Sequence, residues 1–269
     1  MRTVIGLVLL HLPALLIGQV FMRPIDNAAS LALGGATAAY PGLRTGLGND
    51  AALGMAPRSG VLLGSAIPFG IGGWQTARFQ GFFRTSANDG LGFDIAHSGV
   101  EAYSEQRFRF AYGRRLGSGL WLGGSADVLR VSAQEYGSAT GFTFNLSILA
   151  NPLPQVWLGA QVQNPVQAEL SGNVVPAVLR ISAAWLPSST LTVLAETEKD
   201  LDRPAQVKIG FEYRPVSRVV LRTGIRTEPA RLGLGGGFRL ANGMEIGVAG
   251  EWHPTLGITP AAVFIWQRE

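Results

Sequence analysis

Apolar and polar residues alternate along most of the chain beyond residue 60, and the alternation is clearest between residues 205 and 252. Val207, Ile209 and Phe211 stand at odd positions there, and charged or small residues separate them. Successive side chains of a β-strand point to opposite faces, so this pattern predicts strands with one apolar and one polar face. Pro, Gly and Asn interrupt the alternation at short intervals, which is typical of consecutive antiparallel strands.

Fourteen segments qualify as strands, and most have the length of about 9 to 11 residues that a tilted membrane-spanning strand needs. Two architectures accommodate such an array. A soluble sandwich buries its apolar face, whereas a membrane barrel turns that face to lipid and its polar face to the lumen. The predicted strands are residues 60–68, 73–84, 91–98, 105–114, 119–133, 141–150, 155–163, 177–186, 190–198, 205–214, 218–226, 231–239, 244–252 and 258–267.

Composition favours the membrane barrel. Charged residues make up 15% of the chain, against about 25% in a typical soluble domain. Mean hydropathy is slightly positive, yet no stretch after residue 20 approaches the roughly 18 apolar residues of a transmembrane helix. The predicted fold is therefore an all-β, transmembrane, antiparallel up-and-down β-barrel whose outer face contacts outer-membrane lipid. A soluble β-protein is the alternative.

The connections between these strands differ on the two sides of the predicted barrel. One side has only short turns, at residues 85–90, 115–118, 151–154, 187–189, 215–217 and 240–243. The other side includes residues 134–140 and the longest connection, residues 164–176. Short periplasmic turns and longer external loops are typical of bacterial outer-membrane barrels, and an even strand number places both termini in the periplasm.

The amino-terminal part of the chain does not alternate. Arg2 precedes an apolar run from Val4 to Ile17, which predicts a secretory signal peptide over residues 1–18. Residues 19–59 contain two short helix candidates and several small residues, so we expect this segment to plug the lumen of a barrel formed by residues 60–269. The predicted plug residues are Leu33, Gly34, Gly35, Ala36, Asn49 and Asp50.

The polar faces of the predicted strands carry both signs of charge, and these faces would line the lumen. Neighbouring strands supply arginines and acids together, so cross-strand salt bridges are the simplest interpretation. A charge-selective or substrate-contacting lining is the alternative. The predicted lumen charge network consists of Arg78, Arg107, Arg109, Arg180, Glu196, Glu198, Lys208, Glu212, Arg214, Arg222, Arg226, Arg239, Glu245 and Glu251.

Large aromatic residues gather at the ends of the predicted strands. Outer-membrane barrels carry girdles of aromatic side chains at the level of the lipid headgroups. Rings that cap a soluble sandwich are the alternative. The predicted girdle residues are Trp74, Tyr112, Trp185, Tyr213, Trp252 and Trp266.

The sequence offers little for catalysis. It contains no Cys, which excludes thiol catalysis and cysteine metal sites. Beyond the signal peptide only His97 and His253 remain, and two separated histidines do not form a transition-metal site. Asp94 and His97 would point to opposite faces of one strand, so they cannot form the hydrogen bond of a catalytic triad. We predict no enzymatic activity and no metal.

Two further binding functions are disfavoured. The glycines from Gly233 to Gly237 alternate within a strand and no helix follows, so they do not match a nucleotide-binding loop. We expect these glycines to leave room in the lumen for the amino-terminal segment. The arginines are spread over many strands, whereas nucleic-acid binding requires a clustered basic patch. We therefore predict no cofactor and no nucleic-acid partner.

Residues 29–36, with the sequence ASLALGGA, and residues 48–53, with the sequence GNDAAL, resemble the opening of the FadL/PorV-like outer-membrane barrels. The chain departs from the family pattern at residues 54–57, where GMAP stands in place of the usual Asn-Pro-Ala element. The resemblance implies one of two functions. Some members take up fatty acids or other hydrophobic solutes, and others, resembling PorV and PorQ, serve type IX protein secretion.

The short connections and the charged lumen favour the second of these functions. Uptake members of the family carry long external loops that form an apolar capture site, and this chain leaves few residues for such loops. We therefore expect a non-enzymatic, partner-binding barrel of secretion to the cell surface, with secretion components or secreted cargo as partners. The alternative is a FadL-like channel for hydrophobic or small solutes. A purely structural barrel is the third possibility.

Overall fold

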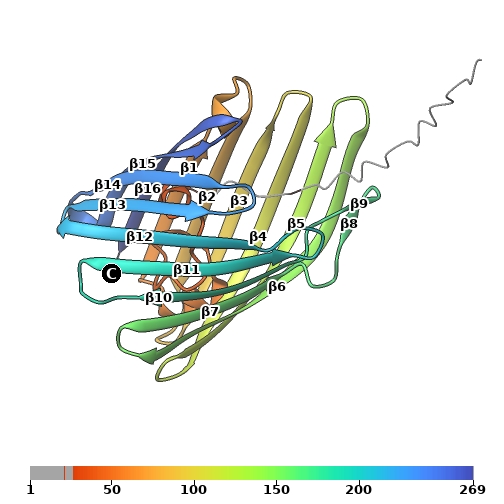
Figure 1. The fold of residues 1–269 in the computed structure, drawn as a ribbon. Helices are drawn as coiled ribbons and strands as arrows, with labels where there is room; N and C mark the ends of the chain where they lie inside the picture. The colour runs from red at the N-terminus through yellow and green to blue at the C-terminus, as the bar shows by residue number, and fades with distance from the viewer. Residues whose placement is uncertain (1–20, 22–26, 269) are drawn as a thin grey trace, which may run out of the picture.

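The protein is a closed β-barrel (Figure 1). The computed structural model describes residue 21 and residues 27–268; the predicted signal peptide, residues 1–18, lies outside the described residues. Fourteen strands form the wall, and β1 closes the barrel by pairing with both β2 and β16. Every neighbouring pair is antiparallel, so the predicted up-and-down barrel is confirmed.

The fourteen strands of the wall correspond one to one with the fourteen predicted segments. They are β1 (Ser59–Ala66), β2 (Gln75–Arg84), β3 (Asp89–Val100), β4 (Tyr103–Gly117), β5 (Leu120–Ala133), β6 (Gly137–Leu153), β7 (Val156–Gln163), β10 (Val178–Trp185), β11 (Leu191–Asp200), β12 (Gln206–Val216), β13 (Val219–Arg226), β14 (Arg231–Arg239), β15 (Met244–His253) and β16 (Gly257–Arg268). The remaining strands, β8 (Glu169–Leu170) and β9 (Asn173–Val174), pair in the connection between β7 and β10.

The two ends of the barrel need names. We call the end at which β1 begins and β16 ends the turn end, and the opposite end the loop end. The prediction of a long loop at residues 134–140 is wrong. Strands β5 and β6 continue until Ala133 pairs with Gly137, because residues 138–140 extend the ladder and Gly137 adopts the positive φ of 80° that a tight turn requires.

The outer surface of the wall is apolar. Phe110 and Phe142 expose 70% and 72% of their surface, and every other wall strand except β11 also carries at least one exposed large apolar residue. The neighbouring inward positions are polar and buried, such as Arg109 and Thr143. A continuous apolar exterior around a polar interior is the pattern of a barrel surrounded by lipid. The protein is therefore a transmembrane β-barrel.

The segment that precedes β1 lies inside the barrel (Figure 1). It contains helix α1 (Ala28–Ala32) and 3-10 helix η1 (Asp50–Met55). Asn27 starts α1 by accepting hydrogen bonds from the N–H groups of Ala29 and Ser30, and Asn49 starts η1 by accepting one from Ala51. Two further 3-10 helices, η2 (Pro68–Gly70) and η3 (Ala241–Gly243), lie in connections. Within the described chain, none of the helices is both long and apolar enough to be a membrane span.

Glycines of the wall make room for this amino-terminal segment. A Cβ atom added at Gly159 would lie 2.1 Å from the carbonyl oxygen of Ala38, and one added at Gly233 would lie 2.4 Å from that of Leu31. A Cβ at Gly235 would lie 2.8 Å from Ala32. The backbone of the segment therefore contacts the backbone of the wall directly, which is the role expected of the β14 glycines from the sequence.

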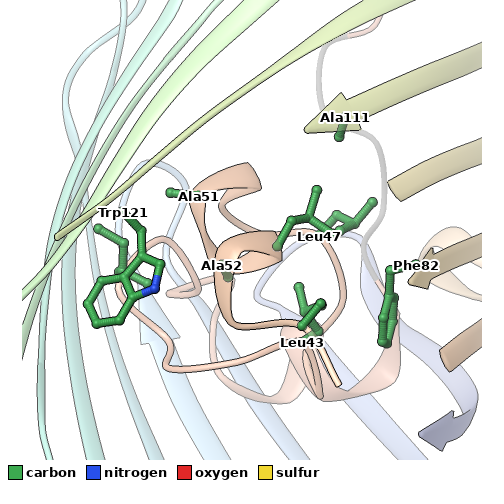
Figure 2. Packing of buried hydrophobic residues seen from close by; sticks show 10 residues of the cluster. Leu43, Leu47, Ala51, Ala52, Phe82, Ala111 and Trp121 are labelled. Carbon is green, nitrogen blue, oxygen red and sulfur yellow. The ribbon is translucent and has the colours of Figure 1, made fainter. Parts of the chain in front are cut away.

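Apolar side chains fill the space between the segment and the wall near the turn end. In Figure 2, Leu43 and Leu47 of the segment lie between Trp121 of β5 and Phe82 of β2. Burying a side chain of this size contributes about 1.5–3 kcal/mol. The segment is thus packed as the core of the barrel.

Candidate functional site

Two cavities in the described part of the lumen lie on opposite sides of the amino-terminal segment. The loop-end cavity has a volume of about 130 Å³ and is lined by Thr37 and Leu47 of the segment together with charged residues of the wall. The turn-end cavity has a volume of about 430 Å³ and is lined by Tyr40 and Arg44 of the segment. No residue lines both cavities. The segment therefore separates them.

One cluster of charges joins strands β2, β3 and β4. Arg78 donates two hydrogen bonds of 2.8 Å to the carboxylate of Asp94, and Arg107 donates a third of 2.9 Å. All three side chains are buried in the wall of the lumen. Two arginines thus share the carboxylate of Asp94. His97 is exposed on the outer face of the same strand, so Asp94 and His97 lie on opposite sides of the wall.

A second cluster connects the wall to η1. Arg109 pairs with Asp127 through bonds of 2.8 and 2.9 Å and lies 3.8 Å from Asp50 at the start of η1. Ser125 donates a hydrogen bond of 2.7 Å to Asp50. Burial raises the pKa of Asp50, although Arg109 and the Ser125 hydroxyl act in the opposite direction. This carboxylate is the link between η1 and strands β4 and β5.

A third cluster connects the wall to the middle of the segment. Glu196 of β11 pairs with Arg180 at 2.7 Å and with Lys208 at 3.0 Å. Its other oxygen accepts hydrogen bonds from the N–H groups of Thr37 and Ala38, at 3.0 and 2.9 Å. Arg180 also donates to the carbonyl oxygen of Gly35. Glu198 completes the cluster by pairing with Lys208.

A fourth cluster lies near the turn end. Arg222 of β13 pairs with Glu212 at 2.8 Å and with Glu245 of β15 at 2.9 Å. The second pair crosses strand β14, where Gly237 has no side chain to separate the two groups. Glu245 also pairs with Arg239 at 3.0 Å, and Glu212 lies 3.7 Å from Arg214.

The same cluster holds Tyr40 of the amino-terminal segment. Tyr40 donates a hydrogen bond to the Glu212 carboxylate, whose oxygens lie 3.0 and 3.1 Å from the hydroxyl. Burial and the neighbouring Glu212 raise the pKa of Tyr40 well above its usual range, so the phenol keeps the proton that it donates. A single tyrosine thus fixes the middle of the segment to strand β12.

All fourteen residues of the predicted lumen charge network point inward and form ion pairs. Those not yet placed are Arg226 and Glu251, which pair with each other across β14. The arrangement neutralises most lumen charges, and it holds the wall strands and the segment together. The sequence analysis missed Asp127, Arg231, Tyr40 and Arg44. Asp127 was detectable, because it stands at an inward position of the predicted strand 119–133.

The predicted plug residues all lie in the described part of the segment and are buried. Leu33 packs against the wall glycines Gly210 and Gly224, and Gly34 and Gly35 take positive φ values in the turn after α1. Ala36 belongs to an apolar cluster with Leu194. The side chain of Asn49 donates to the carbonyl oxygen of Ile148 in β6.

The predicted girdle residues lie on the outer surface of the barrel. Trp74 and Trp252 are near the loop end, at the start of β2 and the end of β15. The other members lie toward the turn end; they are Tyr112, Trp185, Tyr213 and Trp266. Two levels of aromatic side chains are compatible with two lipid headgroup layers.

His253 has a local structural contact. It lies at the end of β15, where its Nδ1 accepts hydrogen bonds of 3.1 Å from the N–H groups of Thr255 and Leu256. Its ring also meets that of Phe69 edge-on. Among the residues that the structure describes, no group of three or more His, Cys, Asp or Glu side chains is placed to hold a metal ion.

Comparison with known proteins gives matches at the level of structure alone. No protein-family model and no curated protein matches the sequence. The toluene transporter TbuX of Ralstonia pickettii is similar in structure, with a TM-score of 0.72 and 14% identity over 93% of this chain and 100% of that chain. The toluene transporter TodX of Pseudomonas putida has a TM-score of 0.72 and 13% identity, over 90% and 98% of the two chains.

A third similar structure is described as a FadL homologue of Pseudomonas aeruginosa. Its TM-score is 0.65 and its identity is 9%, over 91% of this chain and 98% of that chain. Identities this low show a shared fold and leave the activity open. The chain thus has the FadL-like barrel fold.

Proposed function

We propose that the protein is a non-enzymatic channel of the bacterial outer membrane that admits hydrophobic or other small solutes. The observation that carries this proposal is the barrel itself: an apolar exterior and an internal segment between two cavities, in the fold of two toluene transporters. The turn end would face the periplasm, with both termini on that side. Residues 1–18 would direct export as a cleaved signal peptide.

The amino-terminal segment would act as the gate. It separates the two cavities, so a solute passes only when part of the segment moves. Apolar packing and backbone contacts hold it in the lumen, and specific polar contacts fix its position, such as those of Glu196 with Thr37 and Ala38 and of Tyr40 with Glu212. A packed segment whose position is fixed by specific polar bonds would have discrete positions, which is the property that a gate requires.

A partner-binding role in type IX secretion, favoured by the sequence analysis, is the second candidate. One observation supports it: the lumen charges are mostly paired with each other, which leaves few groups free for a solute. The comparisons favour the channel, because the similar structures reported above include named toluene transporters and none is named as a secretion component.

A reversible lock on the segment tests the channel and its gate together. The natural chain has no Cys, and a Cβ at position 235 would lie 2.8 Å from that of Ala32. The usual separation in a disulfide is about 3.8 Å, so the segment must shift outward by about 1 Å for the bridge to form. Uptake of radiolabelled toluene would be measured in whole cells that make the Ala32→Cys/Gly235→Cys variant. We expect slow uptake when the variant is oxidised and faster uptake after reduction.

Matched cells separate the two parts of this proposal. Cells that make the Ala32→Cys single variant should take up toluene at the same rate with and without reductant. If cells with the natural protein take up toluene no faster than cells without it, the channel proposal is wrong for this solute class. If the oxidised double variant transports as well as the reduced one, the segment is not the gate.

A further inference from the structure

The turn-end cavity is unusually rich in arginine. Its volume of about 430 Å³ is within the size range of small-molecule sites. Apolar residues such as Leu43, Met55 and Leu186 form part of its lining. Four guanidinium groups complete it, one from the amino-terminal segment and three from strand ends: Arg44, Arg84, Arg214 and Arg239.

Among the described residues, arginines outnumber the carboxylates beside this cavity. Glu245 is shared by Arg222, Arg239 and Arg44, at 2.9, 3.0 and 3.9 Å. Glu212 is shared by Arg222 and Arg214, at 2.8 and 3.7 Å. Together with Arg84, five guanidinium groups therefore face two carboxylates in the part of the chain that the structure describes. The cavity has a positive potential that attracts anions.

Arg84 is the most available of these cations. It stands at the end of β2, where its backbone N–H bonds to the carbonyl oxygen of Arg58. No carboxylate in the described part of the chain pairs with its side chain. Removing its charge therefore breaks no ion pair among the described residues, so the substitution tests ligand binding without removing a known structural contact.

Buried hydrogen-bond donors around the cavity lack partners. Gln267 is only 5% exposed, and its Nε2 has no acceptor among the described residues. Nη2 of Arg239 and Nε of Arg214 are also buried and make no hydrogen bond to a described residue; the Glu212 oxygen nearest to Nε of Arg214, at 3.7 Å, is beyond hydrogen-bond distance. Leaving a buried donor unsatisfied costs about 1–3 kcal/mol. Three such donors in one cavity are an arrangement that an acceptor-rich ligand would complete.

We propose that the turn-end cavity is a binding site for an oxyanion, either a phosphate or a carboxylate group. Guanidinium groups match the geometry of both, because each can donate two parallel hydrogen bonds to one oxyanion. Arg84, Arg214 and Arg239 would contact the anion, and the amide of Gln267 would donate to it. The site is independent of the proposed transport of hydrophobic solutes and would exist in a barrel that transports nothing.

Inorganic phosphate is the first probe. Binding to the full-length protein in a neutral detergent would be measured by isothermal titration calorimetry, at constant ionic strength set with sodium chloride. We expect saturable binding to the natural protein and at least tenfold weaker binding to Arg84→Gln. Arg218→Gln is the matched control, because Arg218 is an exposed arginine at the same end that does not line the cavity; its affinity should equal that of the natural protein.

A second pair of measurements identifies the source of the oxyanion. Glycerol 3-phosphate would be titrated in detergent, and retention of phosphatidylglycerol would be measured by native mass spectrometry of the natural protein and Arg84→Gln. Lipid retention that depends on Arg84 identifies a headgroup as the ligand; binding of the soluble phosphates without lipid retention identifies a free anion. Phosphate binding that is absent, or that is equal in the natural protein and Arg84→Gln, overturns the proposal.

Discussion

The carboxylate of Glu196 in the barrel wall lies 3.0 Å from the backbone nitrogen of Thr37 and accepts its hydrogen bond. The same side chain neutralises Arg180 and Lys208. A Glu196→Ala substitution would remove a carboxylate that two buried cations share, and breaking a buried pair in this way costs about 3–5 kcal/mol. We expect a lower urea midpoint and a larger single-channel conductance in planar bilayers.

A control for this variant is Glu101→Ala, which removes an exposed carboxylate from the turn between β3 and β4. Its midpoint and conductance should match those of the natural protein, since exposed charges contribute about 0–1 kcal/mol. An unchanged conductance for Glu196→Ala would mean that this contact does not hold the segment in the lumen.

The β14 glycines provide a matched pair of substitutions on opposite faces of one strand. A methyl group at Gly233 would meet the carbonyl oxygen of Leu31 at 2.4 Å, whereas one at Gly236 would lie 3.6 Å from its nearest neighbour. We expect Gly233→Ala to lose about 1–3 kcal/mol through overpacking and to expose the amino-terminal segment to limited proteolysis. Gly236→Ala should show neither change. Equal protease resistance in both variants would contradict the direct backbone contact.

The lipid-facing surface predicts where a charge is tolerated. Phe110 lies on the outer face in the middle of β4 and is 70% exposed, and Tyr136 lies in a turn at the loop end and is 90% exposed. Phe110→Arg should destabilise the protein in phospholipid vesicles by about 2–4 kcal/mol, because a cation at the bilayer midplane loses its hydration. Tyr136→Arg should be nearly neutral. Similar behaviour of the two variants in reversible vesicle folding would argue against a bilayer around β4.

The buried Asp50 predicts a pH dependence of stability. Burial raises the pKa of this carboxyl above its usual range, so the folded protein holds the proton at pH values where the unfolded chain has lost it. The contribution of Asp50 is therefore greatest below about pH 4 and falls as the pH rises through the folded pKa.

Comparison with Asp50→Asn isolates this effect from other titrating groups. The stability of the natural protein relative to the variant should decline between pH 4 and pH 7, by about 1.4 kcal/mol for each unit by which the folded pKa is raised. Urea midpoints in detergent at both pH values provide the measurement. A relative stability that is constant or rises with pH would show that Arg109 outweighs burial.

The strands were predictable because lipid and lumen impose a period of two on every residue between them. That period is lost at strand ends. The alternation therefore predicts too short a strand for β6, which runs from Gly137 to Leu153. Residues 137–140 and 151–153, at the two ends of this strand, lack the alternation of large apolar and polar side chains that predicts a strand. The turn at residues 134–136 was consequently interpreted as a longer loop.

The inward direction of the charges was also predictable, but their partners were not. Arg222 bonds to Glu245 two strands away because Gly237 leaves a gap, and Tyr40 meets a carboxylate 172 positions along the chain. Such contacts depend on strand order and on how the segment enters the lumen. The alternation of apolar and polar residues predicts neither the strand order nor the path of the segment. It therefore does not predict the turn-end cavity either.

The amino-terminal segment touches opposite parts of the wall, with α1 against β13 to β16 and η1 against β2 to β6. It also precedes every one of those strands in the chain. Because it contacts both sides of the seam, we expect it to be in position by the time β1 and β16 join. The amino-terminal segment would then serve as an internal template around which the barrel closes.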